Sequence, residues 1–264
     1  MASIAFYLDV LDLEQRLPGL DACQHNHAGV DGMEKQSTYN TGRNSRNGRS
    51  ATLVGPWQPL TGQTISLQTG QELYTTGHGD EHLYWVEQGV VEEIHLDAHG
   101  NEKVFCLAGP GEVCGLVLLN RQGNQGLCSR ALTDVVVRPI PLSELDQTSS
   151  IALQRSMLID LSRRLGDLVR QTARLAYWTS EERLAYWLIR LGQVMGETGR
   201  DGHIHLRQRL SQEKLAAMVG STRETVSLCL KRLRQDGMVS YGENRCLTFD
   251  PQRLQRIFSS QHPC

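Results

Sequence analysis

Residues 210–233 read LSQEKLAAMVGSTRETVSLCLKRL, and this stretch predicts two helices joined by a tight turn. Ser211 can cap the first helix, and Gly220 can end it, because a residue without a Cβ adopts left-handed backbone most easily. Ser221 or Thr222 then begins the second helix. Apolar residues at helical spacing turn one side of each helix inward: Leu215, Ala216 and Val219, then Val226, Leu230 and Leu233.

The second helix, expected over residues 222–234, has a polar outer face. Its side chains are of the kinds that reach base edges and phosphates in a major groove: Thr222, Arg223, Glu224, Ser227 and Lys231. An ordinary pair of helices with a solvated polar face is the alternative. Because the cap, the glycine turn, the apolar spacing and the polar start coincide in one short window, the pattern favours DNA binding by a helix-turn-helix.

The composition is that of an ordinary globular chain. Its 264 residues are 39% hydrophobic and 21% charged, with a formal net charge of −2. The first residues, MASIAFYLDVLDLEQ, do not read as a signal peptide, and no run is apolar and long enough to cross a membrane. We therefore expect a cytoplasmic protein, in which the seven scattered cysteines are thiols and not a disulfide framework.

The charge is divided unevenly along the chain. Residues 51–150 contain 4 Lys/Arg and 12 Asp/Glu, a net −8, whereas residues 201–264 contain 10 Lys/Arg and 6 Asp/Glu, a net +4. An acidic part joined to a basic part fits a regulator in which only the basic end meets phosphate.

The first 146 residues divide into two parts. Residues 1–50 end in the polar run QSTYNTGRNSRNGRS and are expected to form a mobile extension. Residues 51–146 contain short apolar or alternating runs punctuated by glycine turns, which predict an antiparallel β-roll or sandwich.

Residues 147–177 predict one long helix. From residue 158 on, apolar residues and one threonine recur in alternating steps of three and four: Leu158, Leu161, Leu165, Leu168, Thr172 and Leu175. This spacing is typical of a coiled coil, and arginines flank the narrow seam. We expect a dimer interface; the alternative is a helix packed on its own domain.

A further helix and a hairpin complete the predicted DNA-binding part, residues 179–264. SEERLAYWLIRLGQVMGE (180–197) reads as an amphipathic helix, with Ser180 as its expected cap. Residues 203–207 predict a short strand. GMVSYGENRCLTFD (237–250) predicts a hairpin, which behind a recognition helix would be a wing.

The order of an acidic β-roll, a long dimer helix and a winged helix-turn-helix resembles the bacterial cyclic-AMP receptor/fumarate-nitrate regulator family of transcription factors. The likeness covers about residues 58–258 and includes the roll's glycine pattern: Gly70, Gly77, Gly79, Gly89, Gly109, Gly111 and Gly115. Within the family, GEVCGLVLLN (111–120) and LSRRLGDLVRQTARL (161–175) are most similar to the cyanobacterial nitrogen-control regulators.

The resemblance places an effector site near Gly115, Leu116 and Arg164, with two departures. Family members that bind cyclic AMP carry a Glu where this chain has Leu116, and an Arg-Ser or Arg-Thr pair where it has Gly126-Leu127. The resemblance therefore argues against cyclic AMP as a ligand. The nitrogen-control branch binds 2-oxoglutarate through two Arg and a Glu; only Arg164 matches, while Val169 and Gly126 replace the others. A 2-oxoglutarate-like effector remains one hypothesis, and the absence of any effector is another.

The resemblance also assigns the reading of bases. Arg223 and Glu224 match the family's Arg-Glu pair, which would contact guanine and the cytosine amino group. A second family Arg aligns with Leu228, which offers only an apolar contact, for instance to a thymine methyl group. We therefore expect a related but altered half-site.

Two other chemistries compete with this interpretation. Cys106, Cys114 and Cys128 could form a redox or metal sensor, but buried thiols explain them as well. His78, His82 and Glu87 suggest a cupin-like metal enzyme, although the second half of that motif is missing. Cys23, His25 and His27 offer only three ligands, and solvated polar residues account for them more simply.

The sequence thus predicts a homodimeric α+β transcription regulator that is not an enzyme and has no certain cofactor or metal. Its partners would be double-stranded DNA, a second copy and RNA polymerase, without a membrane. Arg223 and Glu224 would read bases, Ser227 and Lys231 would contact the backbone, and Arg209 or Lys214 could join them. With Ser211, Thr222 and Leu228 these residues form the predicted interface.

Overall fold

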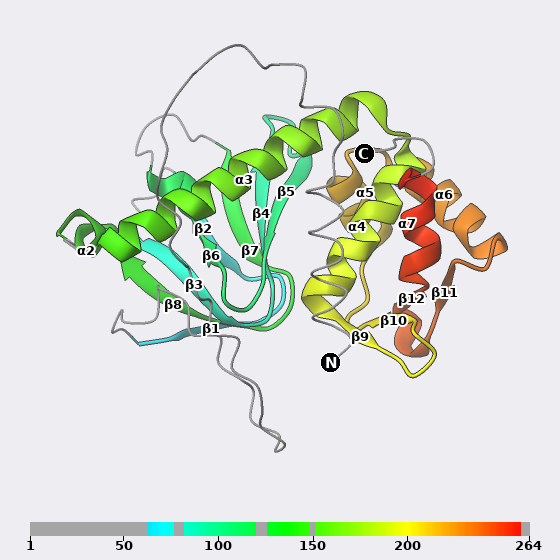
Figure 1. Cartoon of the computed structure of the whole chain (residues 1–264), viewed down its shortest axis with the longest axis horizontal. Helices are drawn as coiled ribbons and strands as arrows, with labels where there is room; N and C mark the ends of the chain where they lie inside the picture. The colour runs from blue at the N-terminus through cyan, green and yellow to red at the C-terminus, as the bar shows by residue number, and fades with distance from the viewer. Residues whose placement is uncertain (1–62, 77–81, 120–125, 148–150, 260–264) are drawn as a thin grey trace, which may run out of the picture. The chain divides into compact units, whose positions relative to one another are not determined.

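The computed structural model describes residues 63–76, 82–119, 126–147 and 151–259 (Figure 1). The predicted extension over residues 1–50, with Cys23, His25 and His27, lies outside the described residues. No helix in the described part is long and apolar enough to cross a membrane.

Two four-stranded antiparallel sheets form the predicted roll. The first has the order β1 (Ile65–Leu67), β8 (Val135–Pro141), β3 (His82–Gln88) and β6 (Val113–Cys114). The second has the order β2 (Glu72–Thr75), β7 (Leu127–Ala131), β4 (Val91–Leu96) and β5 (Glu102–Ala108). The run RALTDVVVRPIPL divides between β7 and β8, because the chain turns at residues 132–134 and changes sheet.

Alternating side chains of the strands build the core of the roll. One cluster joins the two sheets and includes Tyr74, Val86, Val91 and Val137. A second cluster includes Leu83, Trp85 and Leu116 of the roll together with Leu142 and Leu153 of the helices that follow. Leu116 begins the short helix η2 (Leu116–Leu119). The helical region is therefore packed on the roll by apolar contacts at its beginning.

The long helix predicted from residue 147 begins later. A short helix, α2 (Leu142–Gln147), ends where it was expected to start, and α3 runs over Ile151–Tyr177. Leu142 of α2 and Leu153 of α3 pack in one cluster with Leu83 of the roll, so both helices contact the same core.

The described C-terminal part contains four α-helices and the third sheet. Helix α4 (Ser180–Met195) is followed by β9 (Gly196–Thr198), β10 (Ile204–Leu206), α5 (Gln212–Val219) and α6 (Arg223–Gln235). The hairpin of β11 (Val239–Tyr241) and β12 (Leu247–Phe249) encloses η3 (Glu243–Arg245), and α7 (Pro251–Ser259) ends the described chain. The sheet order is β11-β12-β10-β9, so the predicted hairpin is present. Neither β9 nor α7 was predicted from the sequence.

The cap of α4 corrects one sequence prediction. Thr179, and not Ser180, is the N-cap: its hydroxyl accepts a hydrogen bond from the Glu182 backbone N–H at 3.3 Å, and the Glu182 carboxylate accepts one from the Thr179 N–H at 2.6 Å. This reciprocal arrangement is a capping box. Both residues can cap, and the glutamate three positions after Thr179 decides between them.

Candidate DNA interface and effector site

Helices α5 and α6 form the helix-turn-helix expected from the sequence. The Ser211 hydroxyl caps α5 by accepting from the Lys214 N–H at 3.1 Å, and Thr222 caps α6 by accepting from the Thr225 N–H at 3.2 Å. Gly220 between them has φ +67° and ψ +54°, the left-handed conformation that its position predicted. The inward residues of both helices are buried, as expected: Leu215, Ala216, Val219, Val226, Leu230 and Leu233.

The opposite face of α6 is open to solvent. Arg223, Glu224 and Lys231 are exposed on it, Ser227 is half-buried, and the Leu228 side chain is 59% exposed. The predicted contact residues of α6 therefore share one accessible surface, whereas the hydroxyls of Ser211 and Thr222 are engaged in capping.

Arg223 has a partner on the other helix of the motif. Its Nε lies 3.0 Å from Glu213 Oε1, and both side chains are more than half exposed. Exposed ion pairs contribute little free energy, so this pair leaves Arg223 available to a guanine or a phosphate.

The wing adds residues that sequence analysis did not select. Tyr241 and Arg245 line an open hollow of about 530 Å³ together with residues of the helix-turn-helix, among them Arg209, Ser211 and Arg223. Asn244 and Arg245 have positive φ values of 53° and 57°, which turn the chain sharply at the tip of the wing. The Arg234 guanidinium lies 5.0 Å from the centre of the Tyr241 ring. The signal that could have identified these wing residues as part of a DNA interface is the clustering of arginines next to an exposed aromatic ring.

Lys214 does not share the exposed surface of α6. Its Nζ lies 2.6 Å from Glu92 Oε1 and 3.2 Å from Glu102 Oε2, both in the roll. Glu92 is buried, and Arg130 lies 3.6 Å from the same Oε1 atom. Lys214 was one of two residues suggested as an additional contact to the DNA backbone, but here it joins α5 to acidic residues of the roll.

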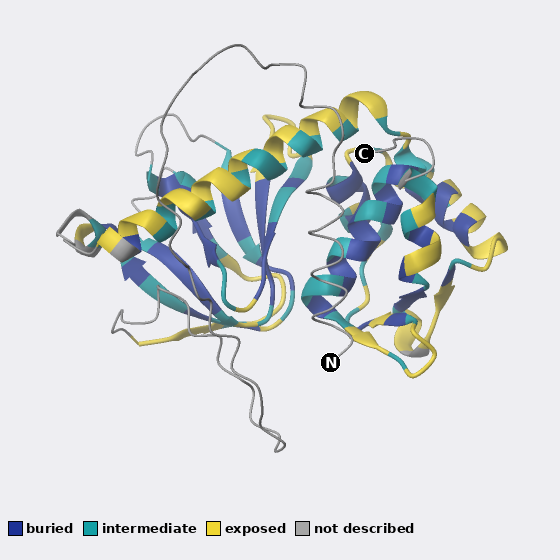
Figure 2. Cartoon of the chain, viewed as in Figure 1, coloured by how far each residue is buried: buried dark blue, intermediate teal, exposed yellow. Residues whose placement is uncertain are grey.

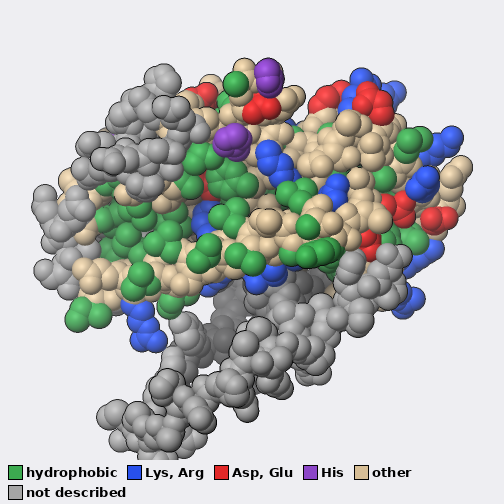
Figure 3. Space-filling model, turned by 90° about the horizontal axis from the view of Figure 1, so that it is seen from above, with side chains coloured by type: hydrophobic (Ala, Val, Ile, Leu, Met, Phe, Trp, Pro, Cys, Tyr) green, Lys and Arg blue, Asp and Glu red, His purple; other side chains and the backbone are tan. Residues whose placement is uncertain are grey.

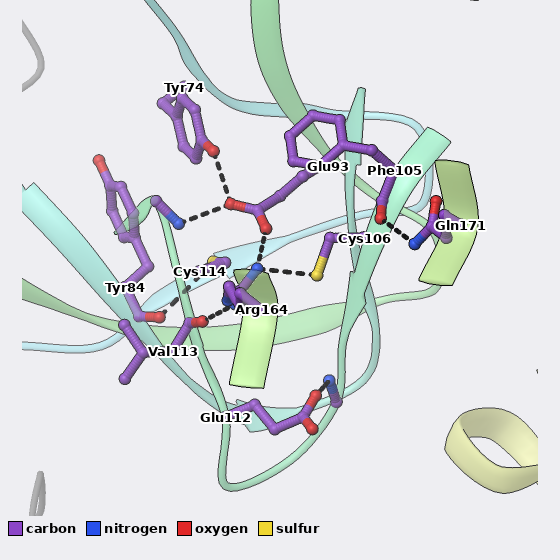
Figure 4. A network of polar contacts seen from close by, with 12 residues as sticks. Tyr74, Tyr84, Glu93, Phe105, Cys106, Glu112, Val113, Cys114, Arg164 and Gln171 are labelled. Carbon is purple, nitrogen blue, oxygen red and sulfur yellow. Dashed lines mark hydrogen bonds and ion pairs between the residues drawn. The ribbon is translucent and has the colours of Figure 1, made fainter. Parts of the chain in front are cut away.

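Two of the three residues predicted for the effector site meet at one carboxylate. Figure 4 shows Arg164 of α3 pointing at the side chain of Glu93 in β4, with which it forms an ion pair. The Gly115 N–H donates to Glu93 Oε1 at 2.8 Å, and so does the Tyr74 hydroxyl at 2.8 Å. Arg164 also donates to the Val113 carbonyl oxygen. Glu93 was not among the predicted site residues, because nothing in the local sequence distinguishes it from a solvated glutamate.

The other aligned positions of that site carry no polar side chain. Leu116 is buried with Leu83 and Trp85. Gly126 has φ +78°, and a Cβ built on it would lie 2.5 Å from the Leu96 carbonyl oxygen. No side chain fits there without movement of the backbone, so the place of the family arginine at position 126 is closed. Val169 is exposed on α3.

A hollow of about 300 Å³ lies next to this network. Its lining includes Cys106 and Leu116 of the roll, Arg164 and Leu168 of α3, and Trp187 of α4. Its size is at the lower end for small-molecule sites.

The cysteines of the roll are free thiols. Cys114 and Cys128 are buried and Cys106 is half-buried, and burial raises the pKa of all three. Thiols with raised pKa values react slowly. Across the described residues, no group of three His, Cys, Asp or Glu side chains could hold a metal. Glu87 of the cupin hypothesis pairs with Arg138 at 2.5 Å, and His78 lies outside the described residues.

The face of α3 that was predicted to pair is open in the single chain. Leu158, Leu161, Leu165, Leu168 and Leu175 are exposed, as is Thr172. Figure 2 shows exposed residues along much of α3, and Figure 3 shows apolar side chains on the face along which it runs. An apolar stripe of this length is typical of a surface that another helix covers.

Two family models match the chain at the two regions just described. Residues 182–257 match the Crp-like helix-turn-helix domain, and residues 64–150 match the cyclic nucleotide-binding domain. The chain belongs to the cyclic-AMP receptor/fumarate-nitrate regulator family. Members of this family are transcription regulators, and their helix-turn-helix domain binds DNA.

Relatives of both predicted kinds are found within the family. The chain is 27% identical to the CRP-like cAMP-activated global transcriptional regulator of Mycobacterium tuberculosis, over 74% of this chain and 87% of that one. It is also 27% identical to the global nitrogen regulator of Synechococcus elongatus, over 75% and 90%. A solved CRP/FNR-family regulator from Thermus thermophilus superposes with a TM-score of 0.64 at 27% identity, covering 76% of this chain and 100% of the other.

Proposed function

We propose that the protein is a sequence-specific transcription regulator that binds a near-palindromic DNA site as a homodimer. Two copies would pair along the exposed stripe of α3, so that the two α6 helices enter successive major grooves. The half-sites would then lie about 34 Å apart, one turn of the DNA helix.

The observation that carries the proposal is the outer face of α6. Arg223, Glu224 and Leu228 are exposed on a helix whose opposite face is buried through Val226, Leu230 and Leu233. Arg223 would bond guanine bidentately, Glu224 would accept from the cytosine amino group, and Leu228 would contact a thymine methyl group. Ser227, Lys231 and Arg209 would contact the backbone, together with the capped turns at Ser211 and Thr222.

The remaining regions follow from the same proposal. We assign residues 51–146 to a sensory domain, 147–178 to dimerisation and 179–264 to DNA binding, with 1–50 as an extension. RNA polymerase is the expected protein partner, the cytoplasm of a bacterium is the expected location, and no catalysis is expected. For the effector we keep two hypotheses: a 2-oxoglutarate-like anion near Gly115, Leu116 and Arg164, or none.

The test is selection of bound duplexes from a random pool by the purified, ligand-free protein. Enrichment of a palindrome with half-sites one turn apart supports the proposal. If the protein binds all duplexes alike, with an affinity that depends on salt concentration and not on sequence, both with and without 2-oxoglutarate, this result contradicts the proposal. Two variants distinguish the roles of the residues: Arg223→Ala is expected to relax the preference at one base, whereas Lys231→Ala should weaken binding to all sequences alike.

A further inference from the structure

The polar groups around Arg164 form a built anion site. A guanidinium from α3, a phenol hydroxyl from β2 and a backbone N–H after β6 converge on one point (Figure 4). Arg164 brings a charge, and Tyr74 and Gly115 bring directed hydrogen-bond donors. Charge-assisted hydrogen bonds of this kind are the usual means of holding a carboxylate or a phosphate.

The chain itself supplies the anion. The side chain of Glu93 is fully buried, and its two oxygens accept from all three donors. Burial alone raises the pKa of a carboxyl group, but Arg164, the Gly115 N–H and the Tyr74 hydroxyl more than offset this, so the pKa of Glu93 is lowered. The carboxylate is therefore charged at neutral pH.

The pair of Glu93 and Arg164 joins two parts of the fold. Arg164 lies in the middle of α3, 71 residues from Glu93 along the chain. Beside it, Gln171 donates to the Phe105 carbonyl oxygen at 2.8 Å, which is a neutral contact between the same helix and β5. Because an unpaired buried charge is costly, Arg164 can take this place against the roll only when an anion meets it.

We propose that Glu93 is a resident anion, which takes the place of an anionic effector and lets α3 pack on the roll without one. This inference rests on the proposed function, because the position of α3 matters through the dimer and its DNA. It makes Glu93 a positioning residue, and it selects the effector-independent hypothesis for the ligand at Arg164.

The first experiment compares two isosteric variants that remove one carboxylate each from the roll. Glu93→Gln removes the anion opposite Arg164. Glu87→Gln is the matched control, because Glu87 pairs with Arg138 within the same domain and not with α3. Affinity for the selected duplex should fall about tenfold or more for Glu93→Gln and change less than about twofold for the control.

The second experiment restores the anion from solution. In Glu93→Gly, millimolar acetate or formate should raise the unfolding temperature and recover DNA affinity, whereas chloride at equal ionic strength should not. Wild-type protein should show neither response, nor a response to 2-oxoglutarate or cyclic AMP. A gain in wild-type DNA affinity of about tenfold with either effector, lost in Arg164→Gln, would overturn the inference.

Two further outcomes are decisive in other ways. If Glu93→Gly does not fold, the double variant Glu93→Gln/Arg164→Gln takes its place, and its stability should exceed that of each single variant, because no charge is left unpaired. Additive losses would contradict the pairing.

If the wild type selects no DNA, the proposed function fails, while the effect of acetate on the unfolding of Glu93→Gly still tests the resident anion.

Discussion

Glu92 and Glu93 follow one another in β4, but their carboxylates hold different helices. Glu92 lies 2.6 Å from Lys214 of α5, and Glu93 is paired with Arg164 of α3. Consecutive side chains of a strand point to opposite faces of the sheet, so one strand reaches both α3 and the helix-turn-helix. Both carboxylates are buried, and each is paired with a cation.

The contact between Lys214 and Glu92 can be tested through stability. Lys214→Met leaves a buried carboxylate with only the more distant Arg130, and should lower the free energy of unfolding by roughly 3 kcal/mol. Lys231→Met, on the exposed face of α6, should change it by less than about 0.5 kcal/mol. Denaturant titration measures both. Equal, small effects would show that Glu92 does not need Lys214.

The pH dependence of stability should report Lys103. Its Nζ donates to the Met218 carbonyl oxygen at 2.6 Å, and burial, assisted by Arg183, lowers its pKa to about 8 from 10.5. Below pH 8 both the folded and the unfolded chain carry the charge. Between pH 8 and 10.5 only the folded chain releases the proton, so stability should rise with pH, by at most about 3 kcal/mol.

Lys103→Met removes this rise, and the other groups that titrate in the same range remain in both proteins. Denaturant unfolding at pH 7.5 and 10 should therefore give a larger gain for wild type than for the variant. Parallel profiles of the two proteins would contradict the assignment.

The closed position at Gly126 predicts that an arginine cannot be grafted there. Gly126→Ala should cost at least about 3 kcal/mol, from the left-handed backbone and the contact with the Leu96 carbonyl oxygen. Gly100 has nearly the same φ, +80°, with open space around it, so Gly100→Ala should cost only about 1 kcal/mol. Thermal unfolding compares the two. Equal losses would mean that backbone conformation alone keeps glycine at position 126.

Leu228 should determine one position of the DNA half-site. Leu228→Arg is expected to shift the selected base toward guanine, with roughly 1–3 kcal/mol of new discrimination, because arginine bonds guanine bidentately. Selection from a random duplex pool with wild type and variant measures the change. An unchanged preference would show that the alignment of α6 with the family's recognition helix is wrong.

Leu165 tests the dimer. Its side chain is 63% exposed in the middle of the apolar stripe, so Leu165→Glu would place two charges in the seam. The dimer dissociation constant should rise on the order of a hundredfold, equivalent to about 2.7 kcal/mol. Ile159→Glu, outside the heptad seam of the same helix, is the control. Sedimentation measures the dimer dissociation constant of both variants. A dimer that persists in Leu165→Glu would place the interface elsewhere.

The sequence alone determined the elements whose causes are local. The helix-turn-helix follows from Ser211, Gly220 and apolar spacing within a few residues, and the roll follows from short strands between glycine turns. Each of these signals lies within a short segment of the sequence. It can therefore be recognised without knowing which distant residues contact that segment. The fold class and family expected from them are confirmed.

Only the tertiary structure decided which charges meet. Lys214 lies 122 residues from Glu92, and Arg164 lies 71 residues from Glu93. Nothing in the local sequence distinguishes such glutamates from solvated ones, because a buried charge is tolerated only when the folded chain brings a cation to it. Local spacing therefore set the elements, and long-range electrostatics and packing set the candidate effector site.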